Sequence, residues 1–108
     1  MKMEKKEIEK EVLILKGNGY LLAEMPGHAL KAFKKAGIEI PRTAFGMCAD
    51  KCFEKGLFRE AAQAYATAED EDGLIRVGHQ LLMTETDEEF AEIAYREALR
   101  LRHKANNF

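Results

Sequence analysis

The chain has few of the residues that mark secreted or membrane-bound proteins. It has no tryptophan, only two cysteines and two prolines in 108 residues, and its longest apolar run is Val12 to Leu15. Two cysteines are too few for a secreted disulfide scaffold, and so short an apolar run cannot span a bilayer. The Glu-rich start is unlike a signal or transit peptide. We therefore expect a cytoplasmic protein that is not inserted in a membrane.

An excess of charge of one sign is also lacking. The 17 basic and 19 acidic side chains give a net charge of −2 and are mixed along the chain. A general electrostatic attraction to nucleic acid or to an anionic membrane is therefore not expected. Apolar residues make up 46% of the sequence, and no segment is of low complexity. This length and composition predict one domain, residues 1–108, folded nearly end to end.

Helical signals run through the whole sequence. Apolar residues recur at intervals of three and four, strict alternation is absent, and both prolines, Pro26 and Pro41, stand where a helix would begin. Gly56 is expected to end a helix in the left-handed conformation. Thr86 and Glu89 form a capping box that predicts the start of the last helix. The sequence predicts an all-α fold with six helices near residues 3–24, 26–36, 41–55, 58–69, 71–84 and 87–103.

One pattern of small and aromatic residues recurs three times along the chain. The first copy has Gly17, Tyr20, Ala29, Phe33 and Ala36; the second has Ala49, Cys52, Gly56, Phe58, Ala61, Tyr65 and Ala68; the third has Gly78, Leu81, Ala91, Tyr95 and Ala98. The closing alanines are 32 and 30 residues apart, a period typical of helix-hairpin repeats. We therefore expect Gly17 and Gly78 where two helices approach closely, with the segment Gly17-Asn18-Gly19 inside a helix.

These residues resemble tetratricopeptide repeats, and the resemblance covers most of the chain. The sequence departs from that family in its shorter spacing, its lack of Trp, and Cys52 and Leu81 in place of the first aromatic. The resemblance implies three antiparallel helix hairpins stacked as a short right-handed α-α superhelix. It also implies a non-catalytic adaptor or scaffold that binds a protein partner, an apolar peptide or helix, in a concave groove.

In the register of this resemblance, the groove is lined by the first helix of each hairpin. The predicted partner-binding residues are Leu15, Asn18, Leu22, Met47, Asp50, Phe53, Arg76, His79 and Met83. Phe53, Met47 and Leu22 are expected to be the main contacts. Only Asn18 and Arg76 are suited to clamp a terminal carboxylate, so an apolar peptide or amphipathic helix is the favoured ligand. The alternative is that these side chains pack against one another, because Met and Leu at helical spacing are usually core.

No motif for catalysis or cofactor binding occurs in the sequence. A Gly-rich phosphate loop, a nucleophile elbow and an HExxH helix are all absent. Cys48 and Cys52 would share one helix face and supply two zinc ligands, but no His stands at a recognised metal spacing. We interpret both as small buried thiols. We expect neither an enzyme nor a bound metal or cofactor.

Two alternative functions stay open at this point. The first helix carries more apolar residues than one neighbour can cover, which predicts a homodimer through that helix that the pair Val12→Glu with Leu15→Glu should dissociate. Two basic clusters point to nucleic acid, but the first is more simply the solvated face of its helix and the second complements a helix dipole. The balancing acids would also weaken any attraction for phosphate. The apolar set is Ile8, Val12, Ile14, Leu15, Leu21 and Leu22, and the basic clusters are Lys31, Lys34 and Lys35, and Arg96, Arg100, Arg102, His103 and Lys104.

Overall fold

Six helices joined by short connections make up the computed structural model, which describes residues 4–106. They span Lys5–Leu22 (α1), Pro26–Ala36 (α2), Arg42–Glu54 (α3), Phe58–Thr67 (α4), Glu71–Met83 (α5) and Glu88–Asn106 (α6). No strand occurs among the described residues. The all-α prediction is confirmed, and each predicted range overlaps one of these helices. The Gly17-Asn18-Gly19 segment lies inside α1, as predicted.

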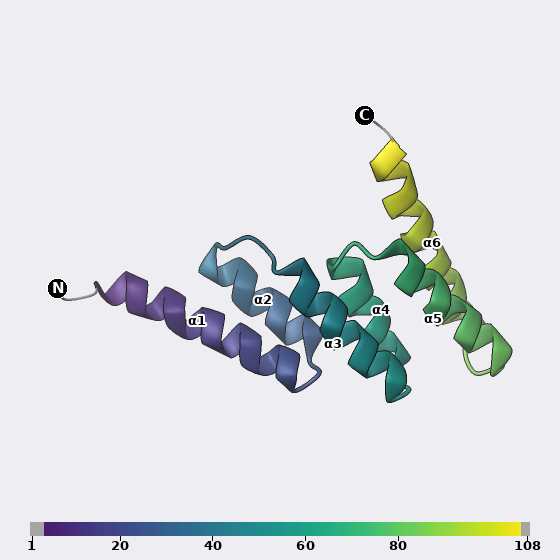
Figure 1. Ribbon diagram of the computed structural model, residues 1–108, viewed down its shortest axis with the longest axis horizontal. Helices are drawn as coiled ribbons and strands as arrows, with labels where there is room; N and C mark the ends of the chain where they lie inside the picture. Colours follow the sequence, from purple (N-terminus) through teal and green to yellow (C-terminus); the bar gives the residue numbers. More distant parts are fainter. Residues whose placement is uncertain (1–3, 107–108) are drawn as a thin grey trace.

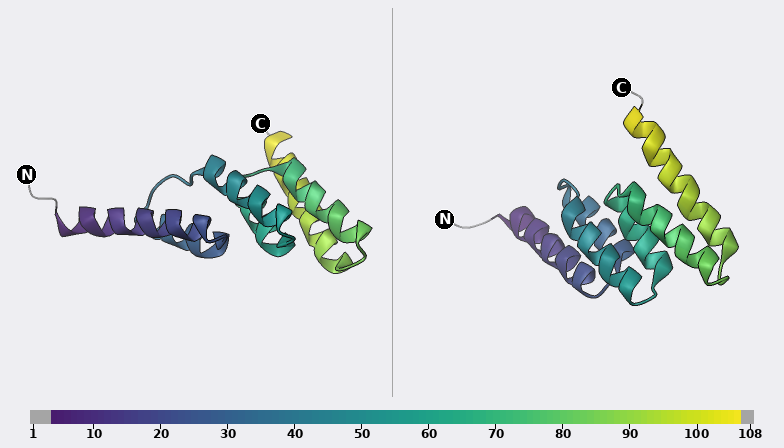
Figure 2. Two further views of the ribbon diagram at one scale, coloured as in Figure 1. Left: turned by 60° about the horizontal axis from the view of Figure 1, so that its bottom comes forward. Right: turned by 45° about the vertical axis from the view of Figure 1, so that its right-hand side comes forward.

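Helices that follow one another in the chain pack together in pairs. The closest partners are α1 with α2, α3 with α4, and α5 with α6 (Figure 1). The second helices touch one another in the order α2, α4, α6, and α1 touches α3. The pairs therefore follow one another along a molecule that measures 56 × 36 × 18 Å (Figure 2). This order leaves one side of α1 and one side of α6 at the ends of the row.

Glycine allows two of these pairs to approach closely. A Cβ atom added at Gly17 would lie 2.6 Å from the ring of Phe33, and one at Gly78 would lie 2.4 Å from the ring of Tyr95. Real Cβ atoms do not come so near to an aromatic ring, so both positions need a residue without a side chain. The predicted roles of Gly17 and Gly78 are confirmed. Ala49, the small residue of the middle copy, is fully buried.

Each of the first five helices is followed by a residue in the left-handed conformation. Gly37 and Gly56 have φ of 72° and 77°, and the prediction for Gly56 is confirmed. The other three positions are glutamates, Glu24, Glu69 and Glu85, with φ between 52° and 59°. A residue with a side chain is strained there, by about 1–2 kcal/mol. Two of these glutamates form ion pairs with distant parts of the chain: Glu24 with Lys55, which follows α3, and Glu69 with Arg42 of α3 and Lys104 of α6.

The start of α6 differs from the prediction by one residue. The Asp87 carboxylate accepts a hydrogen bond from the Phe90 amide at 3.0 Å, so Asp87 is the N-cap. The Thr86 amide instead donates to the carbonyl oxygen of Leu81, and its hydroxyl pairs with that of Thr84 at 2.7 Å. The capping box predicted for Thr86 and Glu89 is therefore wrong. Thr86 belongs to the turn that ends α5 and is not available to begin α6.

Candidate partner-binding surface

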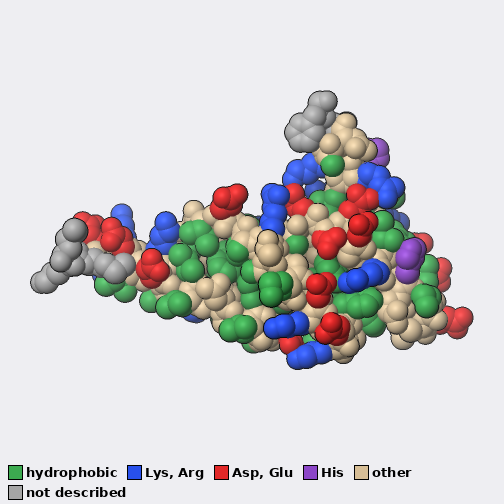
Figure 3. Space-filling model, viewed as in Figure 1, with side chains coloured by type: hydrophobic (Ala, Val, Ile, Leu, Met, Phe, Trp, Pro, Cys, Tyr) green, Lys and Arg blue, Asp and Glu red, His purple; other side chains and the backbone are tan. Residues whose placement is uncertain are grey.

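The predicted site residues lie on α1, α3 and α5, and most of them are accessible. Four large apolar side chains among them are exposed: Leu15 (67%), Leu22 (76%), Met47 (61%) and Met83 (77%). Figure 3 shows hydrophobic side chains gathered along α1 and toward α3. For these four residues, the alternative of packing in the core is therefore wrong. Leu22 and Met47 lie together at one pocket, and exposed apolar side chains gathered in this way are typical of a protein interaction site.

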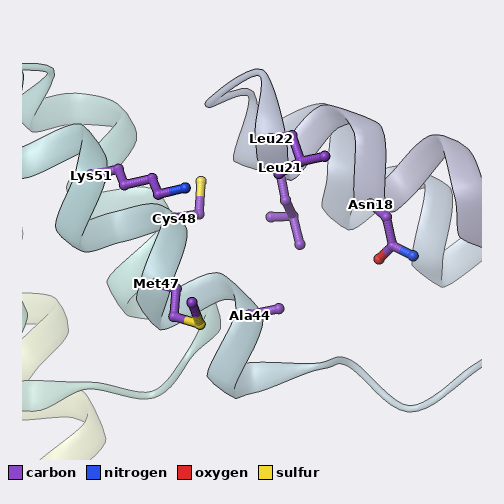
Figure 4. Close-up of a pocket in the computed structure, with 7 residues that line it drawn as sticks. All are labelled: Asn18, Leu21, Leu22, Ala44, Met47, Cys48 and Lys51. Carbon is purple, nitrogen blue, oxygen red and sulfur yellow. The ribbon is translucent and has the colours of Figure 1, made fainter.

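A pocket of about 260 Å³ lies between α1 and α3 and includes three of the predicted residues. In Figure 4, Leu21 of α1 faces Cys48 and Met47 of α3 across the gap, and Lys51 reaches toward it. Leu21 and Cys48 are buried and form the floor, whereas Met47 and Leu22 are exposed and form the rim. We call this the α1–α3 pocket; its lining residues are Asn18, Leu21, Leu22, Ala44, Met47, Cys48 and Lys51.

The boundary between α3 and α5 is built differently, because a buried tyrosine joins two predicted site residues. The Tyr65 hydroxyl, from α4, donates to Asp50 Oδ1 at 2.6 Å and accepts a hydrogen bond from the Arg76 guanidinium at 2.6 Å. Arg76 also lies 3.5 Å from the Asp50 carboxylate and 4.8 Å from the centre of the Phe53 ring. We call Asp50, Tyr65 and Arg76 the polar bridge. It ties α3, α4 and α5 together at one point.

The polar bridge sets the protonation of Tyr65. Burial and the hydrogen bond to Asp50 raise the pKa of the Tyr65 hydroxyl to about 12, and the nearby Arg76 charge only partly opposes this shift. The phenol is therefore neutral at any physiological pH. Because Asp50 and Arg76 already satisfy each other through Tyr65, they are less available to a ligand than the sequence suggested.

The remaining predicted residues on α3 and α5 also have partners within the chain. Phe53 is half-buried and packs edge-on against Phe58, with ring centres 5.5 Å apart. His79 Nδ1 lies 2.8 Å from the Tyr95 hydroxyl. Phe53 is thus partly a structural residue, so it is a poorer candidate for a main contact than Leu22 or Met47. The structure brings together Asn18, Leu22 and Met47 in one place, and Asp50, Phe53 and Arg76 in another.

Sequence reasoning missed the part that Tyr65 plays. The repeat pattern assigned it a core aromatic position, which it fills, since the residue is fully buried. The signal that could have revealed the polar bridge is the hydroxyl, because a buried tyrosine needs a hydrogen-bond partner where phenylalanine needs none. Tyr95, which is only half-buried, also has a partner for its hydroxyl, His79 Nδ1.

Cys48 and Cys52 are free, buried thiols, as the sequence predicted. Burial raises the pKa of both, to about 12 for Cys52, where the neighbouring Cys48 adds to the shift. A neutral, buried thiol is a poor nucleophile and a poor metal ligand. Among residues 4–106, no three His, Cys, Asp or Glu side chains are grouped so as to hold a metal ion.

Comparison of the chain with protein-family models, with curated proteins and with solved structures gives no match. Within residues 4–106, no helix is both long and apolar enough to cross a bilayer.

Proposed function

We propose that this chain is a cytoplasmic, non-catalytic adaptor of tetratricopeptide-like architecture that binds an amphipathic helix of a protein partner at the α1–α3 pocket. The observation that carries the proposal is the exposure of Leu22 and Met47 on the rim of an apolar pocket. Fully burying an aliphatic side chain of this size contributes about 1.5–3 kcal/mol. A partner that buries both rim residues therefore gains favourable binding free energy from each of them.

The dimensions and polarity of the pocket indicate what it accepts. At about 260 Å³ it lies below the roughly 300–1,000 Å³ typical of sites for small molecules and cofactors. One aliphatic side chain from a partner helix suits it better. Lys51 and Asn18 stand at its edge as the polar groups that would orient such a helix. We expect the partner to place an apolar residue in the pocket and an acidic residue near Lys51.

The tetratricopeptide-like part of the proposal is supported by the way the pairs are built. In the first and third pairs, the glycine of the first helix packs on the aromatic ring of the second, Gly17 on Phe33 and Gly78 on Tyr95. These positions are equivalent in the repeat pattern. The middle pair has fully buried Ala49 and Tyr65 at the same two places. The cytoplasmic assignment is supported by the two free, buried thiols.

A role in binding nucleic acid has less support. In the C-terminal basic cluster, Arg102 pairs with Glu71, and Lys104 pairs with Glu69 at 3.0 Å. Arg96 and Arg100 pair with glutamates of their own helix. Each arginine or lysine of this cluster is thus next to a carboxylate, which reduces its attraction for phosphate. Arg102 and Lys104 join α6 to the segment around the start of α5.

The test is to select helical peptides from a displayed library against the full chain, and to measure the affinity of a selected peptide by fluorescence anisotropy. We expect Met47→Glu to weaken binding at least about tenfold, because it places a charge on the apolar rim. Met83→Glu is the matched control, since Met83 is at least as exposed but lies at the far end of α5. Leu22→Glu should act like Met47→Glu.

Any of three results would contradict the proposal. One is the absence of any selectable peptide. Another is a peptide that binds the Met47→Glu and wild-type chains equally well, which would place the binding surface elsewhere. Equal losses from Met47→Glu and Met83→Glu would also count against it, because the surface would then extend over α5. Circular dichroism of each variant shows whether the helices are intact.

A further inference from the structure

The outward face of α1 carries large apolar side chains that are exposed. Ile8 is 49% and Val12 48% exposed, and every residue from 4 to 12 is exposed. The N-terminal turns of α1 extend beyond the end of α2 (Figures 1 and 2). Helical turns without tertiary contacts are marginal in water, because most helix stability in proteins comes from packing. We therefore expect a second molecule to cover this part of α1 and stabilise it.

The apolar residues of this face are spaced like one strip of a coiled coil. Successive members are four, three, four and three residues apart, the spacing of alternating a and d positions in a heptad. The strip faces away from α2, since Gly17, which packs on Phe33, lies on the opposite side of the helix. We call it the α1 seam; it consists of Ile8, Val12, Leu15, Gly19 and Leu22.

Gly19 is the member of the α1 seam that the single chain leaves unexplained. A Cβ atom added there would meet nothing within 4 Å, whereas one at Gly17 would strike Phe33. Glycine inside a helix costs about 0.8–1.0 kcal/mol relative to Ala. No contact among residues 4–106 requires a glycine here, so a contact with another molecule would account for it.

We infer that the α1 seam is a homodimer interface, in which α1 packs antiparallel against α1 of a second copy. A twofold axis through the middle of Lys5–Leu22 makes the two helices overlap along their whole length. In that register, Val12 lies beside Leu15 of the second copy. Ile8 lies beside Gly19 of the second copy, and the missing side chain of Gly19 leaves room for the branched Ile8. This inference goes beyond the proposed function, and the α1–α3 pocket shares only Leu22 with the seam.

The charges beside the seam favour a second copy in this orientation. Glu9 and Lys16 flank the same edge of the seam, and neither forms an ion pair with another of the described residues. Antiparallel pairing in the register above sets Glu9 next to Lys16 of the second copy, and the symmetry repeats the pair. A parallel pairing would set Glu11 next to Lys16 of the second copy, but it would also set Glu4 next to Glu9, where like charges repel. Only the antiparallel register leaves this edge with attractive pairs alone.

The experiment is sedimentation velocity on the full chain over a broad range of concentrations. We expect a monomer–dimer equilibrium for the wild type and a folded monomer for Val12→Glu with Leu15→Glu. Lys16→Glu should weaken the dimer about tenfold, because it replaces two attractions with two repulsions. Lys6→Glu is the matched control with the same change of charge, on the side of α1 away from the seam, and it should leave the dissociation constant unchanged.

The orientation has its own test. Glu9→Lys should weaken an antiparallel dimer, and the exchange Glu9→Lys with Lys16→Glu should restore it, because the opposite charges face each other again. In a parallel dimer, Glu9→Lys would relieve the repulsion from Glu4 and tighten association, which would overturn the register. Two results would overturn the interface itself. One is a wild-type chain that stays monomeric at every concentration, and the other is a dimer that persists in Val12→Glu with Leu15→Glu.

Discussion

The boundary between α1 and α3 and the boundary between α3 and α5 each join the first helices of two successive pairs, but the two boundaries differ in chemistry. The first is an apolar, open pocket with Met47 on its rim. The second is closed by the polar bridge, in which Tyr65 hydrogen-bonds to both Asp50 and Arg76. At the repeat position of Tyr65, α2 has Phe33, which packs edge-on against Phe45 with ring centres 5.9 Å apart.

The difference shows how one hydroxyl group changes the polarity of the surface between two neighbouring helices. Phe33 and Tyr65 fill the same kind of space in the core, and both are almost fully buried. Only Tyr65 has a polar atom to satisfy, so polar side chains of α3 and α5 gather around it. Phe33 has no such atom, and the boundary above it stays apolar. The surface suited to an apolar partner is therefore the one whose core aromatic is a phenylalanine.

Removing either ring should have the largest effect, because the two rings share their packing role. We expect Phe33→Ala and Tyr65→Ala each to lower the free energy of unfolding by about 3–5 kcal/mol. Urea denaturation followed by circular dichroism measures both. A much smaller loss of stability for Phe33→Ala than for Tyr65→Ala would mean that the core beneath the α1–α3 pocket is loosely packed. Phe33 and Tyr65 would then not have the same packing role.

A smaller effect is expected from Gly73, on which the Tyr65 ring rests. A Cβ atom at Gly73 would lie 2.3 Å from that ring, so Gly73→Ala should destabilise the chain by about 1–3 kcal/mol through overpacking. Gly46→Ala is the control in α3, where the added Cβ would only reach Ala68 at 4.0 Å. It should stabilise the chain by up to about 1 kcal/mol, through helix propensity alone. The same urea titration compares them, and a neutral Gly73→Ala would show that the ring can move aside.

The smallest effect is expected from removing only the hydroxyl. Tyr65→Phe should lower the free energy of unfolding by about 0.5–1.5 kcal/mol near neutral pH. Because the folded-state pKa of Tyr65 is raised to about 12 from its ordinary value of 10, its contribution is complete below pH 10 and is lost as the pH rises toward 12. Wild type should therefore lose more stability than Tyr65→Phe over that window. Parallel pH profiles for the two chains would contradict the polar bridge.

The sequence predicted most of the helical framework and part of the surface. Helical periodicity identifies which face of a helix is apolar, so the six helices, the close contact at Gly17 and the exposed Met47 could be anticipated. The polar bridge could not, because it joins side chains of three helices and depends on how those helices cross. The cap at Asp87 was missed for a local reason: Thr86 and Asp87 are both good N-caps, and the turn after α5 uses Thr86.

The buried thiols have a practical consequence for labelling. Cys48 lies on the floor of the α1–α3 pocket and Cys52 in the core, and both are buried with raised pKa values. At neutral pH a thiol reagent should therefore react first with any cysteine placed on the surface. The chain also lacks tryptophan, so one introduced indole would be its only tryptophan fluorophore. A single dye or a single tryptophan beside Met47 can therefore report on the α1–α3 pocket without first removing a native residue.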